Sequence, residues 1–120
     1  MFSAFRKAPA PPLTVAEVAD QVAQGKMLLL DVREVAEAKA SGVAKGAKLI
    51  PLSILGLKCD PNQPNCELPQ GLPIAVYCAS GGRSGMAADA LARLGYGPIT
   101  NLGGLRDWVA GGGAVVPYAA

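Results

Sequence analysis

With 120 residues, 51% of them hydrophobic, the chain has room for one domain with a single core and is too apolar to be disordered. Its 11 Lys and Arg against 9 Asp and Glu give a net charge of +2, which is too small to indicate a nucleic-acid-binding protein. No apolar run is long enough to span a bilayer, and prolines occupy the place where a secretory signal needs its apolar segment, so we expect a cytoplasmic protein without a membrane partner.

The chain divides into a short tail and one domain. Residues 1–12 are rich in Ala and Pro and predict a flexible tail, whereas residues 13–120 predict a single folded domain. Thr14 and Glu17 have the spacing of a capping box, which predicts the start of an amphipathic helix that ends near Gly25.

Strands and helices are then expected to alternate. The apolar runs Met27–Val32 and Ile74–Tyr77 are typical of strands buried on both faces of a parallel sheet. Residues 58–73 contain four prolines and predict an irregular loop. The other expected elements are a helix at 34–40, a strand at 49–50, a helical turn at 53–57, a helix at 84–94 with Met86 in the core, a strand at 99–102, and a helix at 105–110 with Trp108 in the core. This alternation predicts an α/β protein with a mainly parallel central sheet flanked by helices.

The most informative segment lies where the second buried strand stops and a helix starts. It consists of Cys78, Ala79, Ser80, Gly81, Gly82, Arg83 and Ser84. Unpaired amides at such a turn, together with the helix dipole, form a cradle for an anion and lower the pKa of a thiol at its centre. Arg83 adds a planar donor fork that suits oxyanions. The alternative is a small buried cysteine with only a packing role, which leaves the arginine unexplained. We therefore predict a nucleophilic Cys78 with residues 79–84 as its anion-binding loop.

Three motifs, in this order along the chain, resemble those of the rhodanese family of sulfurtransferases. They are Leu30–Glu34, Cys78–Ser84, and Asn101–Gly104 followed by Trp108. The resemblance implies a three-layer rhodanese-like α/β sandwich, a persulfide intermediate on Cys78, and sulfane-sulfur donors such as thiosulfate. We expect no cofactor.

The length of the loop and the residues around it refine this prediction. Six residues run from Cys78 to Arg83 inclusive, one fewer than in cysteine-dependent phosphatases, and the tighter ring favours a sulfur atom over a phosphoryl group. The chain contains no histidine, which excludes the Cys–His pair of thiol proteases. Activation of the thiol must then come from the loop amides, the helix dipole and Arg83, with no nearby acid in sequence to offset the arginine.

Asp31 and Arg33 end the first buried strand, at the sheet edge where Cys78 is also expected. The resemblance implies that they brace the loop, with Asp31 accepting loop amides or pairing with Arg33 or Arg83. The alternative is a local ion pair that holds the following turn.

Two groups of polar residues allow a structural and a functional interpretation. Ser80 and Ser84 are candidates to donate to a bound anion, although Ser84 fits better as a helix N-cap. Lysines stand at positions 39, 45, 48 and 58 with no acid between them. They form either a solvated surface or a positive rim that steers anions to the site.

Cys59 and Cys66 enclose a short polar segment within the irregular loop. Three interpretations compete: a loop-closing disulfide, half of a metal site, and one cysteine resolving the persulfide on Cys78. Two thiolates without a histidine fall short of a zinc set, so no metal is expected, and a disulfide is unusual in a reducing cytosol. We favour a pair that can be oxidised and reduced.

Three functions follow from the sequence. The first is an enzyme that moves sulfur from a small anion such as thiosulfate to a thiophilic acceptor, either a thiol or a protein. The second is a persulfide carrier that works with a partner protein. The third, and weakest, is a phosphatase or arsenate reductase that uses the same cradle.

Overall fold

The centre of the molecule is a small parallel β-sheet. The computed structural model describes residues 13–119, so the tail predicted for residues 1–12 lies outside the described residues. Four strands pair in the order β3–β1–β4–β5, and each neighbouring pair is parallel. They are β1 (Leu28–Asp31), β3 (Lys48–Leu49), β4 (Ile74–Cys78) and β5 (Ile99–Gly104).

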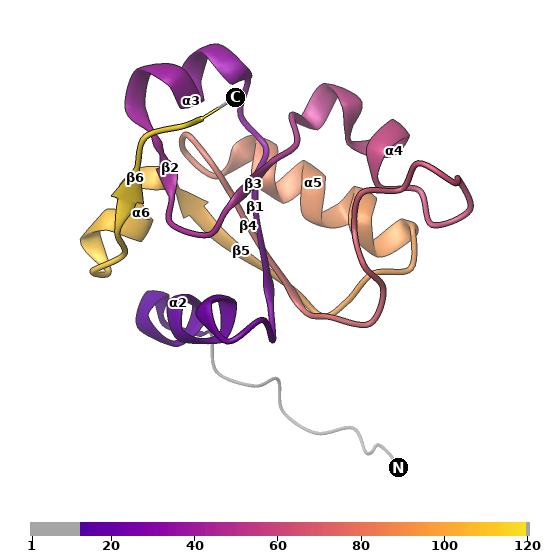
Figure 1. Cartoon of the computed structure of the whole chain (residues 1–120), viewed down its shortest axis with the longest axis horizontal. Helices are drawn as coiled ribbons and strands as arrows, with labels where there is room; N and C mark the ends of the chain where they lie inside the picture. The colour runs from indigo at the N-terminus through magenta and orange to yellow at the C-terminus, as the bar shows by residue number, and fades with distance from the viewer. Residues whose placement is uncertain (1–12, 120) are drawn as a thin grey trace.

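Helices cover both faces of this sheet (Figure 1), which confirms the predicted three-layer α/β sandwich. On one face lie α2 (Val15–Ala23) and α6 (Leu105–Ala110), and on the other lie α4 (Leu55–Lys58) and α5 (Gly82–Arg93). The short helix α3 (Val35–Ser41) follows β1, and a 3-10 turn, η1 (Leu52–Ile54), precedes α4.

Two apolar cores result from the alternation of side chains along the strands. On β4, Ala75 and Tyr77 face the core formed with α2 and α6, whereas Val76 and Cys78 face the core formed with α4 and α5. This alternation sets the direction of the site, because it turns the Cys78 side chain towards α5.

The capping box predicted at the start of the first helix is present. The Thr14 amide donates to Glu17 Oε1 at 2.7 Å, and the Glu17 amide donates to Thr14 Oγ1 at 3.1 Å. Each side chain therefore satisfies an amide that would otherwise lack a partner at the helix start. In the described part of the chain no helix or strand occurs between Cys59 and Pro73, as the prolines predicted.

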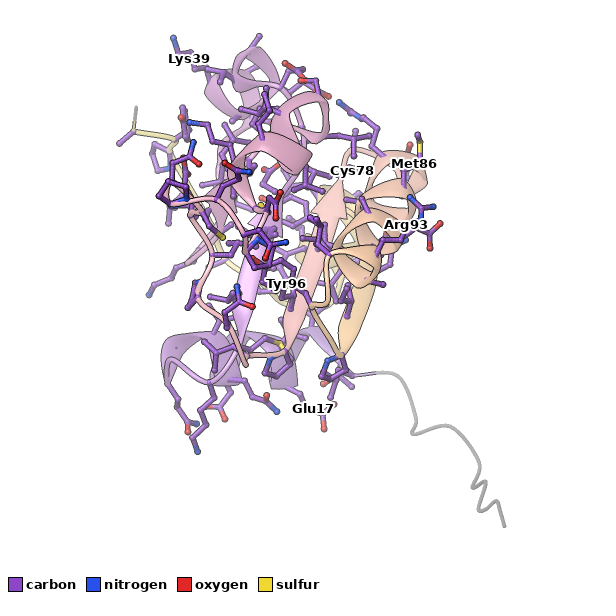
Figure 2. The ribbon with its side chains drawn as sticks, turned by 90° about the vertical axis from the view of Figure 1, so that its right-hand side faces the viewer. Glu17, Lys39, Cys78, Met86, Arg93 and Tyr96 are labelled. Atoms are coloured by element: carbon purple, nitrogen blue, oxygen red, sulfur yellow. The ribbon has the colours of Figure 1, made fainter. Side chains whose placement is uncertain are left out.

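Other local expectations were wrong. A two-stranded antiparallel ribbon of β2 (Val43–Ala44) and β6 (Val115–Val116) was missed, because two residues are too few to show a periodic pattern. Trp108 is buried as predicted, but Met86 is 63% exposed (Figure 2). The inner face of α5 is instead formed by Ala87 and Leu91.

Within residues 13–119 there is no helix of the length and hydrophobicity required to cross a membrane.

Candidate active site

Cys78 is the last residue of β4 and lies immediately before the loop that leads into α5. Figure 2 shows it at the arrowhead end of its strand, beside the beginning of that helix. Its side chain is almost fully covered, with 1% of the residue exposed. The loop turns back on itself at Gly81, whose φ of 107° is the left-handed conformation that glycine adopts without strain.

Hydrogen-bond donors of the loop point at the Cys78 sulfur. The Gly81 amide donates to Sγ at 3.0 Å, and the Ser84 hydroxyl lies 3.4 Å from the same atom. Burial raises the pKa of the Cys78 thiol, but the Ser84 hydroxyl and the amides of Ser84, Gly81 and Ser80 together lower that pKa to about 7. A thiol with this pKa is about half ionised at neutral pH, which is the state a nucleophile requires.

Asn101 on β5 holds the loop from the side. Its Oδ1 lies 2.7 Å from the Ser84 hydroxyl oxygen, so it is a second acceptor, beside the Cys78 sulfur, for the one proton of that hydroxyl. The same Oδ1 accepts from the Gly103 amide at 2.9 Å. Its Nδ2 donates to the Gly81 carbonyl at 3.4 Å. Asn101 belongs to the third sequence motif, but no role was predicted for it, because nothing in the order of residues shows that β5 pairs with β4 beside the loop.

The close packing of β5 against the loop also explains why position 104 is a glycine. A Cβ atom at Gly104 would collide with the backbone carbonyl of Ala79, so this position has no room for a side chain. The end of β5, which extends two residues beyond the strand expected at 99–102, is therefore part of the wall that supports the loop.

Ser84 does not cap the helix, contrary to the prediction. The N-cap of α5 is Gly81, and Ser84 lies in the first turn, fully buried. Its hydroxyl faces both the Cys78 sulfur and Asn101. Ser84 is therefore a neighbour of the thiol rather than a terminal residue of the helix.

Arg83 is held by a carboxylate, and this corrects the expectation that no acid offsets its charge. Arg83 Nη1 donates to Glu37 Oε1 at 2.7 Å, and Nη2 donates to Glu37 Oε2 at 2.8 Å. These bonds to Arg83, and a further one from the Glu34 amide, hold the pKa of Glu37 at about 2. Sequence reasoning missed the pair because Glu37 lies on α3, which only the fold brings to the start of α5.

Asp31 and Arg33 form a buried ion pair of their own. Arg33 Nη2 donates to Asp31 Oδ2 at 2.7 Å and to the Gly42 carbonyl at 2.6 Å. The Tyr77 hydroxyl donates to Asp31 Oδ2 at 2.6 Å. Of the predicted roles for Asp31, pairing with Arg33 is confirmed. Its hydrogen bonds go to Arg33 and Tyr77, not to the loop amides or to Arg83, so the pair fixes β1, β4 and the end of α3 relative to one another.

Cys59 and Cys66 are free thiols near the opposite end of α5 from Cys78. Cys66 Sγ lies 3.2 Å from the Tyr96 hydroxyl, which donates to the Cys59 carbonyl at 2.8 Å. Tyr96 follows the last turn of α5, whereas Cys78 precedes its first turn, and a 12-residue helix rises about 18 Å. This separation argues against either cysteine resolving a persulfide on Cys78.

Two observations limit the reactions open to Cys59 and Cys66. Burial raises the pKa of the Cys59 thiol to about 11, so it is protonated at neutral pH. Among residues 13–119, no three or more metal-binding side chains of Cys, Asp or Glu lie close enough to hold an ion. An oxidised Cys59–Cys66 pair stays a prediction.

Two of the four lysines are paired with an acid from outside their stretch. Glu67 lies 3.0 Å from Lys58 Nζ and 3.5 Å from Lys48 Nζ. Their charges are therefore partly offset, which favours the solvated surface over a positive rim.

Comparison with known proteins identifies the family of this chain. The family model of the rhodanese-like domain matches residues 14–111. A curated relative, an uncharacterized protein of Bacillus subtilis, is 38% identical over 84 residues, which are 69% of this chain and 61% of the relative. The chain therefore spans less than two thirds of the length of that relative.

Solved structures with the same fold carry different descriptions. A human single-domain sulfurtransferase superposes with a TM-score of 0.71 at 28% identity, covering 85% of this chain and 97% of the human one. A protein of unknown function from Rhodopseudomonas palustris, described as a possible tyrosine phosphatase, superposes with a TM-score of 0.75 at 25% identity, covering 88% and 83%.

Proposed function

Because this chain belongs to the rhodanese-like domain family, we propose that it is a sulfurtransferase that carries sulfane sulfur as a persulfide on Cys78. The observation that supports this most strongly is the cradle around the thiol. Backbone amides and the Ser84 hydroxyl point at one sulfur atom and lower the pKa of the Cys78 thiol, against the effect of burial, to about 7. The same donors suit the terminal sulfur of a persulfide anion.

The proposed reaction is two successive sulfur exchanges. The Cys78 thiolate attacks the outer sulfur of the donor, a new S–S bond forms at Sγ, and the donor's own S–S bond breaks. The leaving group is sulfite from thiosulfate, or a thiolate from a thiol persulfide. An acceptor thiolate or cyanide then attacks the outer sulfur and restores the Cys78 thiolate. Each exchange conserves electrons, so the cycle needs no external oxidant or reductant.

A persulfide carrier that exchanges sulfur with a partner protein is the second candidate. The observation in its favour is the burial of Cys78, which is 1% exposed. A persulfide on so well covered a residue is shielded from thiols and oxidants in solution until a partner docks at the loop, and a carrier requires this shielding.

A phosphatase fits the site less well. Cysteine phosphatases rely on a bidentate arginine to bind the oxygens of the phosphoryl group, and both terminal nitrogens of Arg83 are bonded to Glu37.

The test is a sulfur-transfer assay on the intact chain, with thiosulfate and a low-molecular-weight thiol persulfide as donors and cyanide or a thiol as acceptor. Cys78→Ser should abolish transfer from both donors, because serine keeps the size of the side chain but cannot form a persulfide. Cys66→Ser is the matched control and should retain activity, since Cys66 contacts Tyr96, which follows the last turn of α5, whereas Cys78 precedes the first turn. Transfer that survives in Cys78→Ser would refute the proposal.

A further inference from the structure

The contact between Glu37 and Arg83 occupies the edge of the guanidinium formed by its two terminal nitrogens, one of the edges through which an arginine grips an oxyanion. Both terminal nitrogens of Arg83 donate to the two oxygens of one carboxylate, at 2.7 and 2.8 Å. The pair lies at the surface, with the Arg83 and Glu37 side chains 35% and 36% exposed. A bound anion cannot use this edge of the guanidinium while Glu37 occupies it.

The charges near the loop do not favour a dianion. Arg83 is the cation of the loop, and its charge interacts with the Cys78 thiolate and with the carboxylates of Glu37 and Glu34. On the other side of the loop, Asp107 accepts from the Gly104 amide at 2.8 Å. The charge of Arg83 is thus offset by two carboxylates, and the remaining attraction for an anion comes from the loop amides.

The possible sulfur donors differ in the charge that they bring to the loop. Thiosulfate enters with two negative charges and leaves sulfite, also a dianion. A thiol persulfide enters at its reacting sulfurs with one charge or none, and it releases a thiolate. The two reactions form the same bond at Cys78 Sγ, so their relative rates report how the site treats charge on the donor.

We propose that Glu37 is a specificity residue which, by occupying the guanidinium fork of Arg83, directs the site towards thiol persulfides and away from doubly charged donors such as thiosulfate. This inference rests on the proposed function and names the substrate class of the same site. Glu37 acts through Arg83 and is a positioning residue, not a catalytic one. Arg83 thereby serves to anchor the loop to α3 rather than to bind the sulfonate group of a donor.

Glu37→Gln tests this with little change in shape. The amide side chain keeps an oxygen for the Glu34 amide, which donates to Glu37 Oε1 at 2.9 Å, so the start of α3 retains its cap. The variant removes the negative charge and leaves one oxygen in place of two for Arg83. The matched control is Glu34→Gln, which removes the same charge from the same segment without removing a bond to Arg83.

The measurement is kcat/KM for thiosulfate and for a low-molecular-weight thiol persulfide with each protein. In the unaltered chain we expect the persulfide to be the better donor. Glu37→Gln should raise kcat/KM for thiosulfate by about tenfold and change that for the persulfide by less than about threefold, because it releases an Arg83 nitrogen that can then donate to an oxygen of the dianion. Glu34→Gln should change the ratio of kcat/KM for the two donors by less than about threefold. Glu34 makes no bond to Arg83, so this variant leaves the terminal nitrogens of Arg83 bonded to Glu37, and the charge it removes is screened by solvent.

Two results would overturn the inference while leaving the proposed function intact. One is a preference for thiosulfate in the unaltered chain, which needs no variant to fold. The other is a Glu37→Gln protein, folded by circular dichroism, that uses thiosulfate no better than before while it still uses the persulfide. Absence of transfer from both donors in the unaltered chain would instead refute the proposed function.

A second readout does not depend on sulfur transfer. Iodoacetate and iodoacetamide alkylate thiolates by the same chemistry and differ by one negative charge. The ratio of their rates at Cys78, followed on the peptide that contains it by mass spectrometry, should favour iodoacetamide in the unaltered chain and move towards iodoacetate in Glu37→Gln. An unchanged ratio in this variant would overturn the role of Glu37, whatever the protein's activity.

Discussion

Replacing Ser84 by alanine removes the hydroxyl that lies 3.4 Å from the Cys78 sulfur, and we expect it to raise the pKa of that thiol from about 7. The substitution should leave the fold intact. Asn101 Oδ1 loses the hydroxyl but still accepts from the Gly103 amide at 2.9 Å, so this oxygen keeps a hydrogen-bond partner.

The size of the shift follows from the strength of one hydrogen bond to a charged group. Such a bond contributes about 1.5–3 kcal/mol, and one pKa unit corresponds to about 1.36 kcal/mol. The pKa of Cys78 should therefore rise by about one to two units. At neutral pH the thiolate fraction then falls from about one half to between about a tenth and a hundredth.

The assay is the rate of alkylation of the Cys78 peptide by iodoacetamide as a function of pH. The midpoint of the profile is the quantity to compare, because a thiolate of higher pKa is also intrinsically more nucleophilic, and rates at a single pH mix the two effects. Ser80→Ala is the control: Ser80 acts on the thiol through its amide, which alanine keeps, so its midpoint should not move. A Ser84→Ala midpoint equal to that of the unaltered chain would refute this account of thiol activation.

Two further predictions concern the ion pairs. Asp31→Asn should lower the free energy of unfolding, measured in urea, by about 3–5 kcal/mol, because it leaves the buried Arg33 charge unpaired. It should leave the midpoint of Cys78 alkylation unchanged. A loss of unfolding free energy under about 1 kcal/mol would contradict this role of the ion pair. The pKa of Glu37 is lowered by Arg83 from 4.5 to about 2 in the folded chain, so the stability it contributes is present above pH 4.5 and is lost as the pH falls through 2. For so exposed a pair the loss should be at most about 1 kcal/mol, and it should be absent from Glu37→Gln; identical pH profiles of unfolding free energy in the two proteins would contradict it.

The position of the thiol could be predicted from the sequence because the information is local. A buried apolar strand, a cysteine, two glycines and the start of a helix follow one another without interruption in residues 74–84, and the amides that contact Cys78 come from this same segment. The order of layers was likewise predictable, because the alternation of strands and helices extends over the whole domain.

What could not be predicted depends on contacts between distant segments. The terminal nitrogens of Arg83 were expected to be free, but they bind Glu37 on α3. In the sequence, β3 and the long loop separate these two residues. The role of Asn101 depends on the pairing of β5 beside β4, which places its side chain against the loop. A sequence shows which residues are capable of a charge or a hydrogen bond, whereas the fold decides which partner each one finds.

The central claim is that Cys78 carries the transferred sulfur, and the most direct measurement is the mass of the Cys78 peptide after incubation with a sulfane donor and removal of excess donor. The account predicts a gain of one sulfur atom on this peptide, lost again when a thiol acceptor is added, and no such gain on the corresponding peptide of Cys78→Ser. A Cys78 peptide that never gains sulfur from thiosulfate or a thiol persulfide, or a gain confined to the Cys66 peptide, would contradict it.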